Sequence, residues 1–492
     1  MKRCERNGLA FGFVLVYLAS WVALRWFLRA APIACSLAVI GFVCVLYVLL
    51  VFYVRPRAPW SNRRYLFCLL LVAALSRLIL FDVPPETLSD DVYRYVWDGK
   101  VQLRGINPYR FSPDAGELIP LREPFHAKIN HPAHLTIYPP VAQLLFALGY
   151  LLAGSSFLGL RMIYLVLDLL AAWWILRIIG EGRGSSFDQP ASSRDALAAT
   201  ELGAGFRPGS SAPARKEDSD RPGGSPGGMW EKVGACRGAL FVYLLSPLVV
   251  IETYVGMHVD VAGMAFLVGA YRFTASRAPY RALALLMAAV FVKYIAVAAV
   301  PVVIMLLVRR RRASGAGVPA TALLKWGAWS LGVTAMLFAP YFSVGPGLFQ
   351  SLVDYSLYWD FNGPIHWLLV SLAGNLAQLA RAIVFLGLLG YILLRRDCPP
   401  AQIQWSVMAL VLTGPAVFPW YLVTLVPFLA LAPTLGGLAI TTLPFLSYVV
   451  LVDYHGTGVW QESPWVRVVE YLPVMVFLTM DLWRRRCIGE RR

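Results

Sequence analysis

Residues 32–54 read PIACSLAVIGFVCVLYVLLVFYV, an apolar run without a charged side chain. A helix of about 20 such residues crosses the hydrocarbon core of a bilayer. Similar runs recur at 10–28, 65–81, 158–180, 236–252, 257–273, 281–307, 322–342, 376–394, 401–419, 420–432, 434–452 and 464–483. Some runs are short or joined by proline, so the sequence predicts one all-α, polytopic transmembrane domain over 1–492 with about 11–14 membrane segments.

The composition and the placement of charge support this fold class. Hydrophobic residues make up 58% of the 492 residues and charged residues 15%, with a formal net charge of +16. The excess of arginine lies at the ends of apolar runs, near 55–64, 309–312, 395–396 and 484–486. This is the positive-inside pattern, and it leaves no basic domain that could bind nucleic acid. The seven cysteines are scattered, without metal-ligand spacing or a disulfide framework.

The same charges predict the topology. Lys2, Arg3 and Arg6 place the N-terminus in the cytoplasm, and three crossings then bring residues 82–137 outside as the first large extracytoplasmic loop. Counting back from the cytoplasmic arginines at 484–486 gives outward loops at 343–375 and 453–463. Two solutions remain for the middle of the chain. The positive-inside rule favours a hairpin of two half-spans at 281–307, a short re-entrant piece at 138–153, and a cytoplasmic side for residues 181–235. These last residues, rich in glycine, serine, proline and charge, are predicted to form a disordered linker.

The first outer loop contains the polar residues of a candidate site. Its sequence from 91 to 104 predicts an amphipathic helix in the membrane interface, ended by Gly105 and by Asn107-Pro108. Lipid does not accommodate the adjacent carboxylates of Asp90 and Asp91, so both are expected at or beyond the bilayer edge. One of them is expected to stabilise the first helical turn, and the other to project as a general base. The sequence does not distinguish the two.

Other ionisable residues lie within or beside apolar runs. His258 and Asp260 begin one run, and Glu252 ends the preceding one. They are either satisfied core residues or functional groups; a metal site is disfavoured because their spacing fits no metal-binding signature. Lys293 lies inside the run at 281–307, where it either makes a structural pair or meets an anion such as a lipid phosphate. We favour the anion.

Several aromatic and amide residues have two interpretations. Asn107-Pro108-Tyr109 and Tyr138-Pro139-Pro140 are expected to form turns that shape a cleft. The segments at 358–363 and 419–421, which include Trp359, Asn362, Trp420 and Tyr421, fall on outward loops. They belong either to an aromatic belt or to a site that packs sugar rings.

Seven short motifs occur in a characteristic order: SDDVYRYVWDG at 89–99, GINPY at 105–109, YPP at 138–140, PL at 247–248 with GMHVD at 256–260, VKY at 292–294, WDFNG at 359–363 and PWY at 419–421. Their succession, spread over about 65–455, resembles the bacterial GT-C integral-membrane glycosyltransferases. The nearest group is the polyprenol-phosphate-mannose-dependent mannosyltransferases, and the enzymes that build glycosylphosphatidylinositol anchors are more distant. The segment 181–235 departs from the compact family pattern.

The resemblance implies transfer of a hexose, expected to be mannose, from a polyprenyl-phosphate donor to a glycolipid or glycan acceptor. The reaction would take place at the extracytoplasmic face of a bacterial cytoplasmic membrane, among membrane lipids, by an inverting displacement. Asp90 or Asp91 would be the catalytic base, and Lys293 and His258 are candidates to hold the phosphate, with Arg94 or Arg110 as further cations. The remaining expected substrate-binding residues are Asp260, Asn107, Tyr109, Tyr138, Trp359, Asn362, Trp420 and Tyr421. The scheme requires no cofactor and no metal. The alternative is a transporter or flippase of lipid-linked sugars, which would have charged residues deep along a path between spans and inverted repeats.

Overall fold

The computed structural model describes residues 3–54, 63–181, 238–276, 278–315, 317–395 and 397–489. These residues are almost entirely helical and contain no β-strand; only isolated bridges join Phe361 and Asn362 to Ala416. Apart from Glu181, the predicted linker at 181–235 lies outside the described residues. The expected all-α architecture is confirmed.

The N-terminal half supplies the helices that hold the outer loop. They are α1 (Arg3–Ala30), α2 (Ile33–Leu49), α3 (Arg63–Leu80), α4 (Asp91–Leu103), α5 (Pro140–Ala153), α6 (Leu158–Glu181), α9 (Pro247–Tyr254) and α10 (Asp260–Thr274). The π-helix Leu50–Val54 continues α2, and the outer loop contains 3₁₀ turns at Pro85–Thr87, Gly116–Leu121 and Pro124–Lys128.

The C-terminal half is a second set of helices, many of them broken by 3₁₀ segments. They are α11 (Pro279–Val292), α12 (Val300–Ala313), α13 (Ala320–Phe338), α14 (Gln350–Tyr358), α15 (Pro364–Ala373), α16 (Ala377–Leu394), α17 (Pro399–Thr413), α18 (Val426–Leu431), α19 (Leu435–Ile440), α20 (Val450–Thr457) and α21 (Pro464–Gly489). The 3₁₀ segments are Tyr294–Ala299, Ala339–Phe349, Gly374–Leu376, Pro419–Leu425 and Leu443–Val449. Proline occupies the first turn of α5, α9, α11, α15 and α17, where its fixed φ favours helix initiation and no hydrogen bond is lost.

Six helical stretches are long and apolar enough to cross a membrane: Gly12–Ala30, Ile33–Tyr53, Leu158–Glu181, Ala320–Tyr358, Pro364–Leu394 and Leu435–Thr457. Shorter apolar helices cover Tyr65–Leu80, Pro140–Ala153, Gly238–Tyr254, Pro279–Val292 and Pro419–Leu431. The protein is therefore a multi-pass membrane protein.

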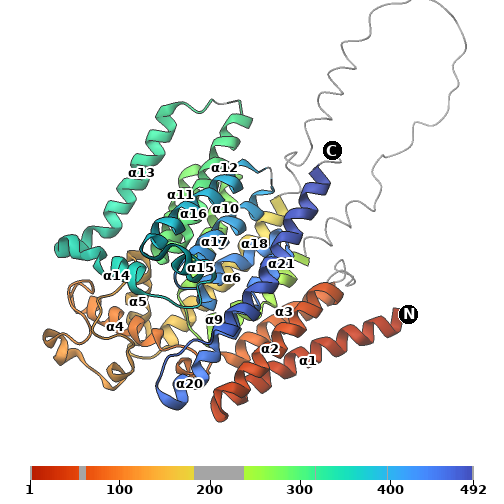
Figure 1. The fold of residues 1–492 in the computed structure, drawn as a ribbon, viewed down its shortest axis with the longest axis horizontal. Coiled ribbons are helices and arrows are strands. Elements are labelled where there is room, and N and C mark those ends of the chain that lie inside the picture. The colour runs from red at the N-terminus through yellow and green to blue at the C-terminus, as the bar shows by residue number, and fades with distance from the viewer. Residues whose placement is uncertain are drawn as a thin grey trace, which may run out of the picture.

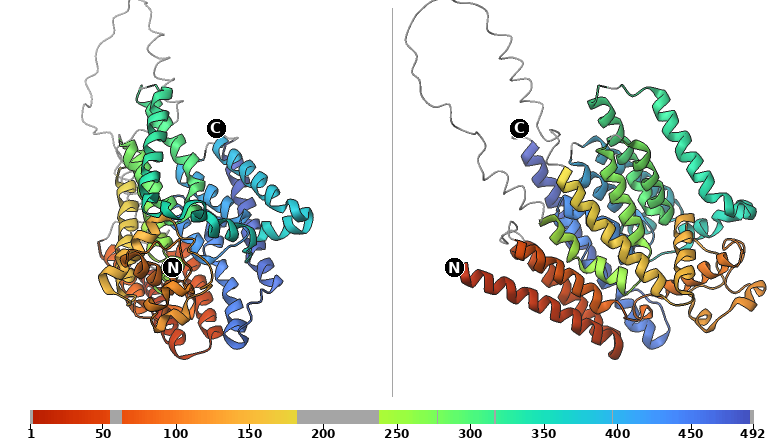
Figure 2. Two further views of the ribbon diagram at one scale, coloured as in Figure 1. Left: turned by 90° about the vertical axis from the view of Figure 1, so that its left-hand side faces the viewer. Right: turned by 180° about the vertical axis from the view of Figure 1, so that it is seen from behind.

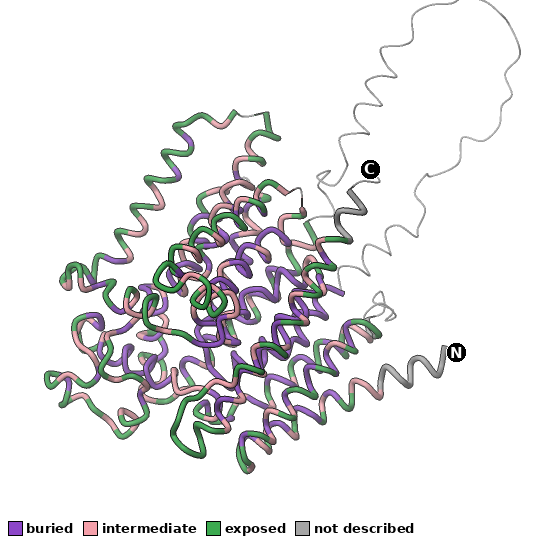
Figure 3. Tube along the Cα trace, in the orientation of Figure 1, coloured by how far each residue is buried: buried purple, intermediate pink, exposed green. Residues whose placement is uncertain are grey.

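Burial identifies the centre of the bundle. Helix α10 is buried along nearly its whole length and packs against α6 and α11 (Figure 3). Helices α13, α15 and α16 lie at the periphery and expose large apolar side chains such as Leu324, Leu372 and Leu386. Such a surface suits contact with lipid hydrocarbon rather than water.

The two ends of the bundle differ. The outer loop with α4 and the short helix α20 lie at one end, whereas the arginine-rich end of α12 and the C-terminal end of α21 lie at the other (Figures 1 and 2). The end of α6 at Glu181 lies on the side of these basic residues (Figure 2).

One predicted segment differs from the structure in detail. The segment 343–375, expected as a loop, is helical through α14 and α15. The run 281–307, expected to form two half-spans, is interrupted where Lys293 adopts an extended conformation (φ −150°, ψ 124°) between α11 and the 3₁₀ segment that leads into α12. This break places a lysine at the tip of two half-spans.

Helix α4 forms where it was expected, but its polar face does not lie open at the membrane interface. Residues 92–101 are all buried, including Arg94, Asp98 and Lys100. Helix α5 packs closely on α4 because Gly99 has no side chain; a Cβ there would lie 2.3 Å from the carbonyl oxygen of Phe146. The amphipathic pattern reflects a buried helix with internally paired charges, since Arg94 Nε donates to Asp98 Oδ1 at 2.9 Å.

A buried ion pair joins the helices behind the outer loop. Arg77 on α3 donates through Nε to Asp168 Oδ2 on α6 at 2.6 Å, and both side chains are almost fully buried. The hydroxyls of Tyr243 and Tyr254 also donate to Asp168, at 2.6 and 2.9 Å. Arg77 makes a further bond to the carbonyl of Leu244 at 2.8 Å. Each charge therefore has several partners, as a buried ion pair requires.

Candidate active site

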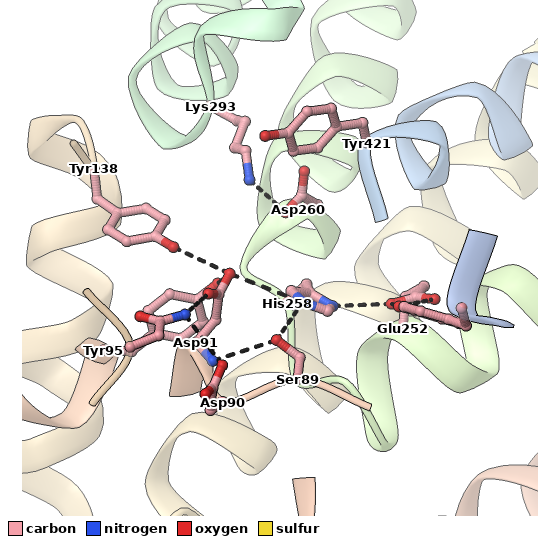
Figure 4. Close-up of polar contacts among 12 residues, drawn as sticks. Ser89, Asp90, Asp91, Tyr95, Tyr138, Glu252, His258, Asp260, Lys293 and Tyr421 are labelled. Atoms are coloured by element: carbon pink, nitrogen blue, oxygen red, sulfur yellow. Dashed lines mark hydrogen bonds and ion pairs between the residues drawn. The ribbon is translucent and has the colours of Figure 1, made fainter. Parts of the chain in front are cut away.

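The start of α4 places Asp91 among hydrogen-bond donors. Its Oδ2 accepts from the hydroxyls of Tyr138 and Tyr95, at 3.2 and 3.4 Å. Its Oδ1 accepts from Asn130 Nδ2 at 2.7 Å (Figure 4). The side chain retains 17% exposure. Asp91 is thus fixed in orientation while one side of its carboxylate remains accessible.

Asp90 has a different environment. It occupies the N-cap position of α4, but its side chain makes no cap hydrogen bond. The backbone N–H of Asp91 donates to Ser89 Oγ at 3.3 Å. Asp91 is the acidic residue in the first turn of α4, the position expected of one aspartate. Asp90 Oδ1 accepts from Asn130 Nδ2 at 3.2 Å. Burial and the neighbouring charge of Asp91 raise the pKa of Asp90 to about 6.

This pKa gives a testable dependence of stability on pH. The folded protein binds a proton at Asp90 more tightly than an unfolded chain, whose aspartates have a pKa near 3.8. The favourable contribution is therefore complete at about pH 4 and is lost as the pH rises through about 6. Asp90→Asn should stabilise the protein at pH 8 by on the order of 1 kcal/mol, because contact with solvent weakens the effect, and should have no effect near pH 4. Thermal unfolding in detergent between pH 4 and 8 measures this; a difference that does not change with pH would contradict it.

Next to the aspartates lies a buried, hydrogen-bonded cluster of His258, Glu252 and Tyr448. His258 Nδ1 lies 2.9 Å from Glu252 Oε2, and its Nε2 lies 3.1 Å from Ser89 Oγ and 3.9 Å from Asp91 Oδ2. Tyr448 donates to both oxygens of Glu252, at 3.0 and 3.1 Å. The imidazole ring stacks on Trp420 with centroids 3.9 Å apart. These contacts fix the ring so that Nε2 faces Ser89 and Asp91 at the start of α4.

The turn before His258 depends on unusual backbone geometry. Met257 has a positive φ of 54°, and a Cβ at Gly256 would lie 2.6 Å from His258 Nδ1. A tight turn of this kind brings the histidine next to Glu252 only because residue 256 is glycine.

Lys293 supplies the cation of the site. Its Nζ donates to Asp260 Oδ2 at 3.2 Å and lies 4.6 Å above the centroid of the Tyr421 ring and 5.9 Å from that of Tyr138. The other oxygen of Asp260 is buried and has no hydrogen-bond partner among the residues that the structure describes. The ammonium group and the Asp91 carboxylate approach the same region from opposite sides (Figure 4).

The structure therefore brings together eight predicted site residues from distant parts of the chain. They are Asp90, Asp91, Tyr138, His258, Asp260, Trp420 and Tyr421, with Lys293 at the break between the half-spans. Within the described ranges no group of three or more His, Cys, Asp or Glu side chains has the geometry to hold a metal ion. The arrangement combines a fixed carboxylate that can accept a proton with an ammonium group that can hold an anion.

Other predicted residues support the site from outside. Arg94 pairs with Asp98 and donates to the carbonyl of His134 at 3.0 Å. Asn107 donates to the carbonyl of Tyr341 at 3.1 Å, and the Tyr109 hydroxyl donates to the carbonyl of Tyr138 at 2.5 Å. These polar atoms hold the turns that carry Tyr138. Arg110 lies against Phe111, 5.2 Å from its ring centroid.

Trp359 and Asn362 lie beside the site rather than in it. The Trp359 ring stacks on Tyr355 at 5.4 Å and contacts His131 edge-on at 4.6 Å. Asn362 is buried and donates through Nδ2 to Glu470, at 3.2 Å to each oxygen.

Sequence reasoning missed several residues that shape the site. Asn130 bridges Asp90 and Asp91, Tyr95 donates to Asp91, and Tyr448 holds Glu252. Asn130 and the nearby His131 and His134 were visible as polar residues of the outer loop, and Tyr95 lies one helical turn after Asp91. Tyr448, in an apolar run, gave no sequence signal.

Comparison with known proteins adds an independent finding. Residues 231–309 match the MptA_B family, described as alpha-(1->6)-mannopyranosyltransferase, N-terminal domain. The matched segment contains Glu252, His258, Asp260 and Lys293. No curated protein and no solved structure matches the chain. Residues 231–309 of this multi-pass membrane protein are therefore similar to the N-terminal domain of a mannosyltransferase family.

Proposed function

We propose that this protein transfers a mannosyl residue from a polyprenyl-phosphate donor to a hydroxyl group of a glycolipid or glycan acceptor, with Asp91 as the general base. The observation that carries the proposal is the position of Asp91, which Tyr138 and Asn130 hold opposite the Lys293 ammonium. Lys293, His258 and Asp260 belong to the segment that matches the mannosyltransferase family, and Asp91 faces them from the outer loop.

The proposed chemistry is a single displacement. Asp91 accepts the proton of the acceptor hydroxyl while the oxygen of that hydroxyl attacks the anomeric carbon of the donor. The bond from that carbon to the phosphate oxygen breaks, and the polyprenyl phosphate leaves with the electron pair. One displacement inverts the anomeric centre. If the product is an α-mannoside, as the family name states for its members, the donor must be β-linked.

Lys293 is the proposed partner of the leaving phosphate. Its ammonium carries a positive charge within reach of the site, and phosphate oxygens could replace Asp260 as its acceptor. Charge that develops on the leaving oxygen would then be stabilised where little water is present.

The proposed side of the reaction is the extracytoplasmic face of a bacterial cytoplasmic membrane. The site lies at the end of the bundle opposite the arginines at 309–312, which the positive-inside rule assigns to the cytoplasm (Figure 1). Nucleotide sugars are cytoplasmic, so an enzyme at the outer face needs a donor carried by a lipid.

Lys293→Met should raise the KM for the donor by about 10- to 100-fold, because a charge-assisted hydrogen bond to phosphate is worth about 1.5–3 kcal/mol. Initial rates at varied donor concentration measure this. Lys325→Met, at an exposed lysine of α13, is the matched control and should leave the KM unchanged. Unchanged donor kinetics in Lys293→Met would assign this lysine a structural role.

The function itself is tested with purified protein in detergent and a panel of labelled donors: polyprenyl-phosphate mannose, polyprenyl-phosphate glucose and GDP-mannose, each with a mannoside acceptor. Product formation from polyprenyl-phosphate mannose alone is the expected result, with linkage and anomeric configuration read by NMR. Transfer from GDP-mannose alone would refute the lipid donor. Movement of lipid-linked sugar across proteoliposomes without any glycoside product would identify a transporter instead.

A further inference from the structure

Ser89 lies between the proposed base and the buried cluster around His258, and the proposed chemistry gives neither of these two residues a role. The Ser89 hydroxyl oxygen lies 3.1 Å from His258 Nε2 and 3.3 Å from the backbone nitrogen of Asp91 (Figure 4). Ser89 stands two residues before the start of α4, and His258 two residues before the start of α10. This hydroxyl therefore joins the beginning of the helix that carries the base to the turn that leads into α10.

The direction of the hydrogen bonds along this link follows from the backbone of Asp91. A backbone nitrogen can only donate, so Ser89 Oγ accepts from it. The single hydroxyl proton of Ser89 is then available to His258 Nε2, which accepts it. His258 is fully buried, which favours a neutral imidazole, and a neutral ring that accepts at Nε2 carries its proton on Nδ1. Nδ1 then donates to Glu252 Oε2 at 2.9 Å, and the chain of hydrogen bonds runs from Asp91 to Glu252.

The far end of the link is held in place by several contacts. The hydroxyl of Tyr448 donates to both oxygens of Glu252, and the backbone N–H of His258 donates to the carbonyl of Glu252 at 2.9 Å. The Trp420 ring stacks on the imidazole with centroids 3.9 Å apart. Because His258 is fixed at its backbone, at one ring face and at Nδ1, its Nε2 can hold the Ser89 hydroxyl in one position.

The same contacts make His258 a poor ligand for the donor phosphate. Each ring nitrogen already has a partner within the protein, and the side chain is only 1% exposed. A phosphate oxygen would have to displace Ser89 or Glu252 to reach the ring. Lys293, whose side chain is 17% exposed, can reach a bound anion more easily. The geometry thus favours different tasks for the two residues.

We propose that Ser89 and His258 are positioning residues, which fix the backbone at the start of α4 and thereby hold Asp91 in place for proton transfer. The inference rests on the proposed mannosyl transfer. The Asp91 side chain has other donors, so loss of the link should leave the carboxylate in the site but less accurately placed. A misplacement of about 1 Å can lower a rate by about 100-fold, and the loss should fall on kcat rather than on the KM for the donor.

Ser89→Ala tests the link with the smallest change in packing. We expect kcat to fall by about 10-fold with the KM for the donor unchanged, because the start of α4 loses its hydrogen bond to the His258 side. Ser356→Ala is the matched control, at an exposed serine whose hydroxyl bonds within its own helix α14, and it should keep the kcat of the wild type. A wild-type kcat in Ser89→Ala would overturn the proposal.

Two substitutions at His258 separate positioning from phosphate binding. Glutamine and asparagine both remove the ring and its stacking on Trp420, but only the longer glutamine can place an oxygen near the position of Nε2 and accept from Ser89. His258→Gln should therefore have a kcat about 10-fold higher than His258→Asn, with the donor KM of the wild type in both. In combination with Ser89→Ala the two should be equally active, because no hydroxyl remains for the glutamine to accept from. A donor KM raised about 10-fold or more in both variants would assign His258 to the phosphate and overturn the proposal.

A spectroscopic measurement tests the link without any substrate. In full-length protein labelled with ¹⁵N-histidine, the His258 signals, assigned by their absence from His258→Gln, should show a neutral ring protonated at Nδ1. Ser89→Ala should shift the Nε2 signal because this nitrogen loses its donor. A charged ring at neutral pH, or a proton on Nε2, would contradict the proposed link.

The two kinds of measurement distinguish this inference from the proposed function. If the wild type transfers mannose and Ser89→Ala keeps its kcat, the inference is wrong and the proposed function stands. If the spectra show the expected ring but no lipid donor supports transfer, the proposed function fails, and the link between Ser89 and His258 stands without the proposed role in mannosyl transfer.

Discussion

Asp91→Asn should lower the rate of mannosyl transfer by about 10²–10⁴-fold, the contribution typical of a general base. Asparagine is nearly isosteric with aspartate, and its oxygen can still accept from the Tyr138 hydroxyl, so the site should remain assembled. Only the capacity to take a proton from the acceptor is lost. The expected effect therefore falls on kcat, with little change in the KM for the donor.

The matched variant is Asp90→Asn, one residue away and also bonded to Asn130. Because the Asp90 carboxylate faces neither Tyr138 nor His258 in any contact of the described residues, this variant should keep transfer within about tenfold of the wild type. Transfer is measured with labelled donor in detergent, after thermal unfolding has shown that both variants are folded. Full activity of Asp91→Asn, or a greater loss in Asp90→Asn, would contradict the assignment of the base.

Asp168→Leu should reduce the free energy of unfolding by about 3–5 kcal/mol, the usual result of removing one partner from a buried ion pair. Arg77 would keep its charge in the bundle after the loss of its carboxylate partner, although it still donates to the carbonyls of Ala73 and Leu244. The hydroxyls of Tyr243 and Tyr254 would also lose their acceptor. Denaturant or thermal unfolding of the detergent-solubilised protein measures the loss.

Two further variants separate this effect from charge removal in general. Asp82→Asn breaks exposed pairs with Arg25 and Arg29 and should cost only about 0–1 kcal/mol. Arg77→Met combined with Asp168→Leu should recover much of the stability, because no uncompensated charge remains. If Asp168→Leu and Asp82→Asn lower the free energy of unfolding equally, the buried pair contributes no more to stability than the exposed pairs.

The membrane segments and much of the candidate site could be predicted from the sequence, because both follow from the cost of polar groups in lipid. Asp91, His258, Asp260 and Lys293 stand out since apolar surroundings make each of them expensive. The helix at 91–104 could be predicted from its periodicity and its glycine stop. Its burial could not, since α5 covers it through a contact at Gly99 that no local pattern reveals.

The choice between Asp90 and Asp91 depends on long-range contacts. Tyr138 and Asn130 lie 47 and 39 residues from Asp91 in the chain. The Tyr138 hydroxyl donates to Asp91 and not to Asp90, whereas Asn130 Nδ2 donates to both aspartates. Similarly, the side-chain amide of Asn362 donates to Glu470, 108 residues later in the chain. Side-chain partners of this kind are set by tertiary packing, which local sequence does not encode.

The contact between Glu252 and Tyr448 bears on how the protein is made. His258 follows Glu252 by six residues, but the tyrosine hydroxyl is 196 residues further along. Ribosomes add about 5–20 residues per second, so this carboxyl group waits roughly 10–40 seconds for its last partner. During that interval the half-made chain must keep it near water or within the insertion machinery. The cluster around Glu252 can therefore form in full only after the C-terminal part of the chain, which contains Tyr448, has been translated.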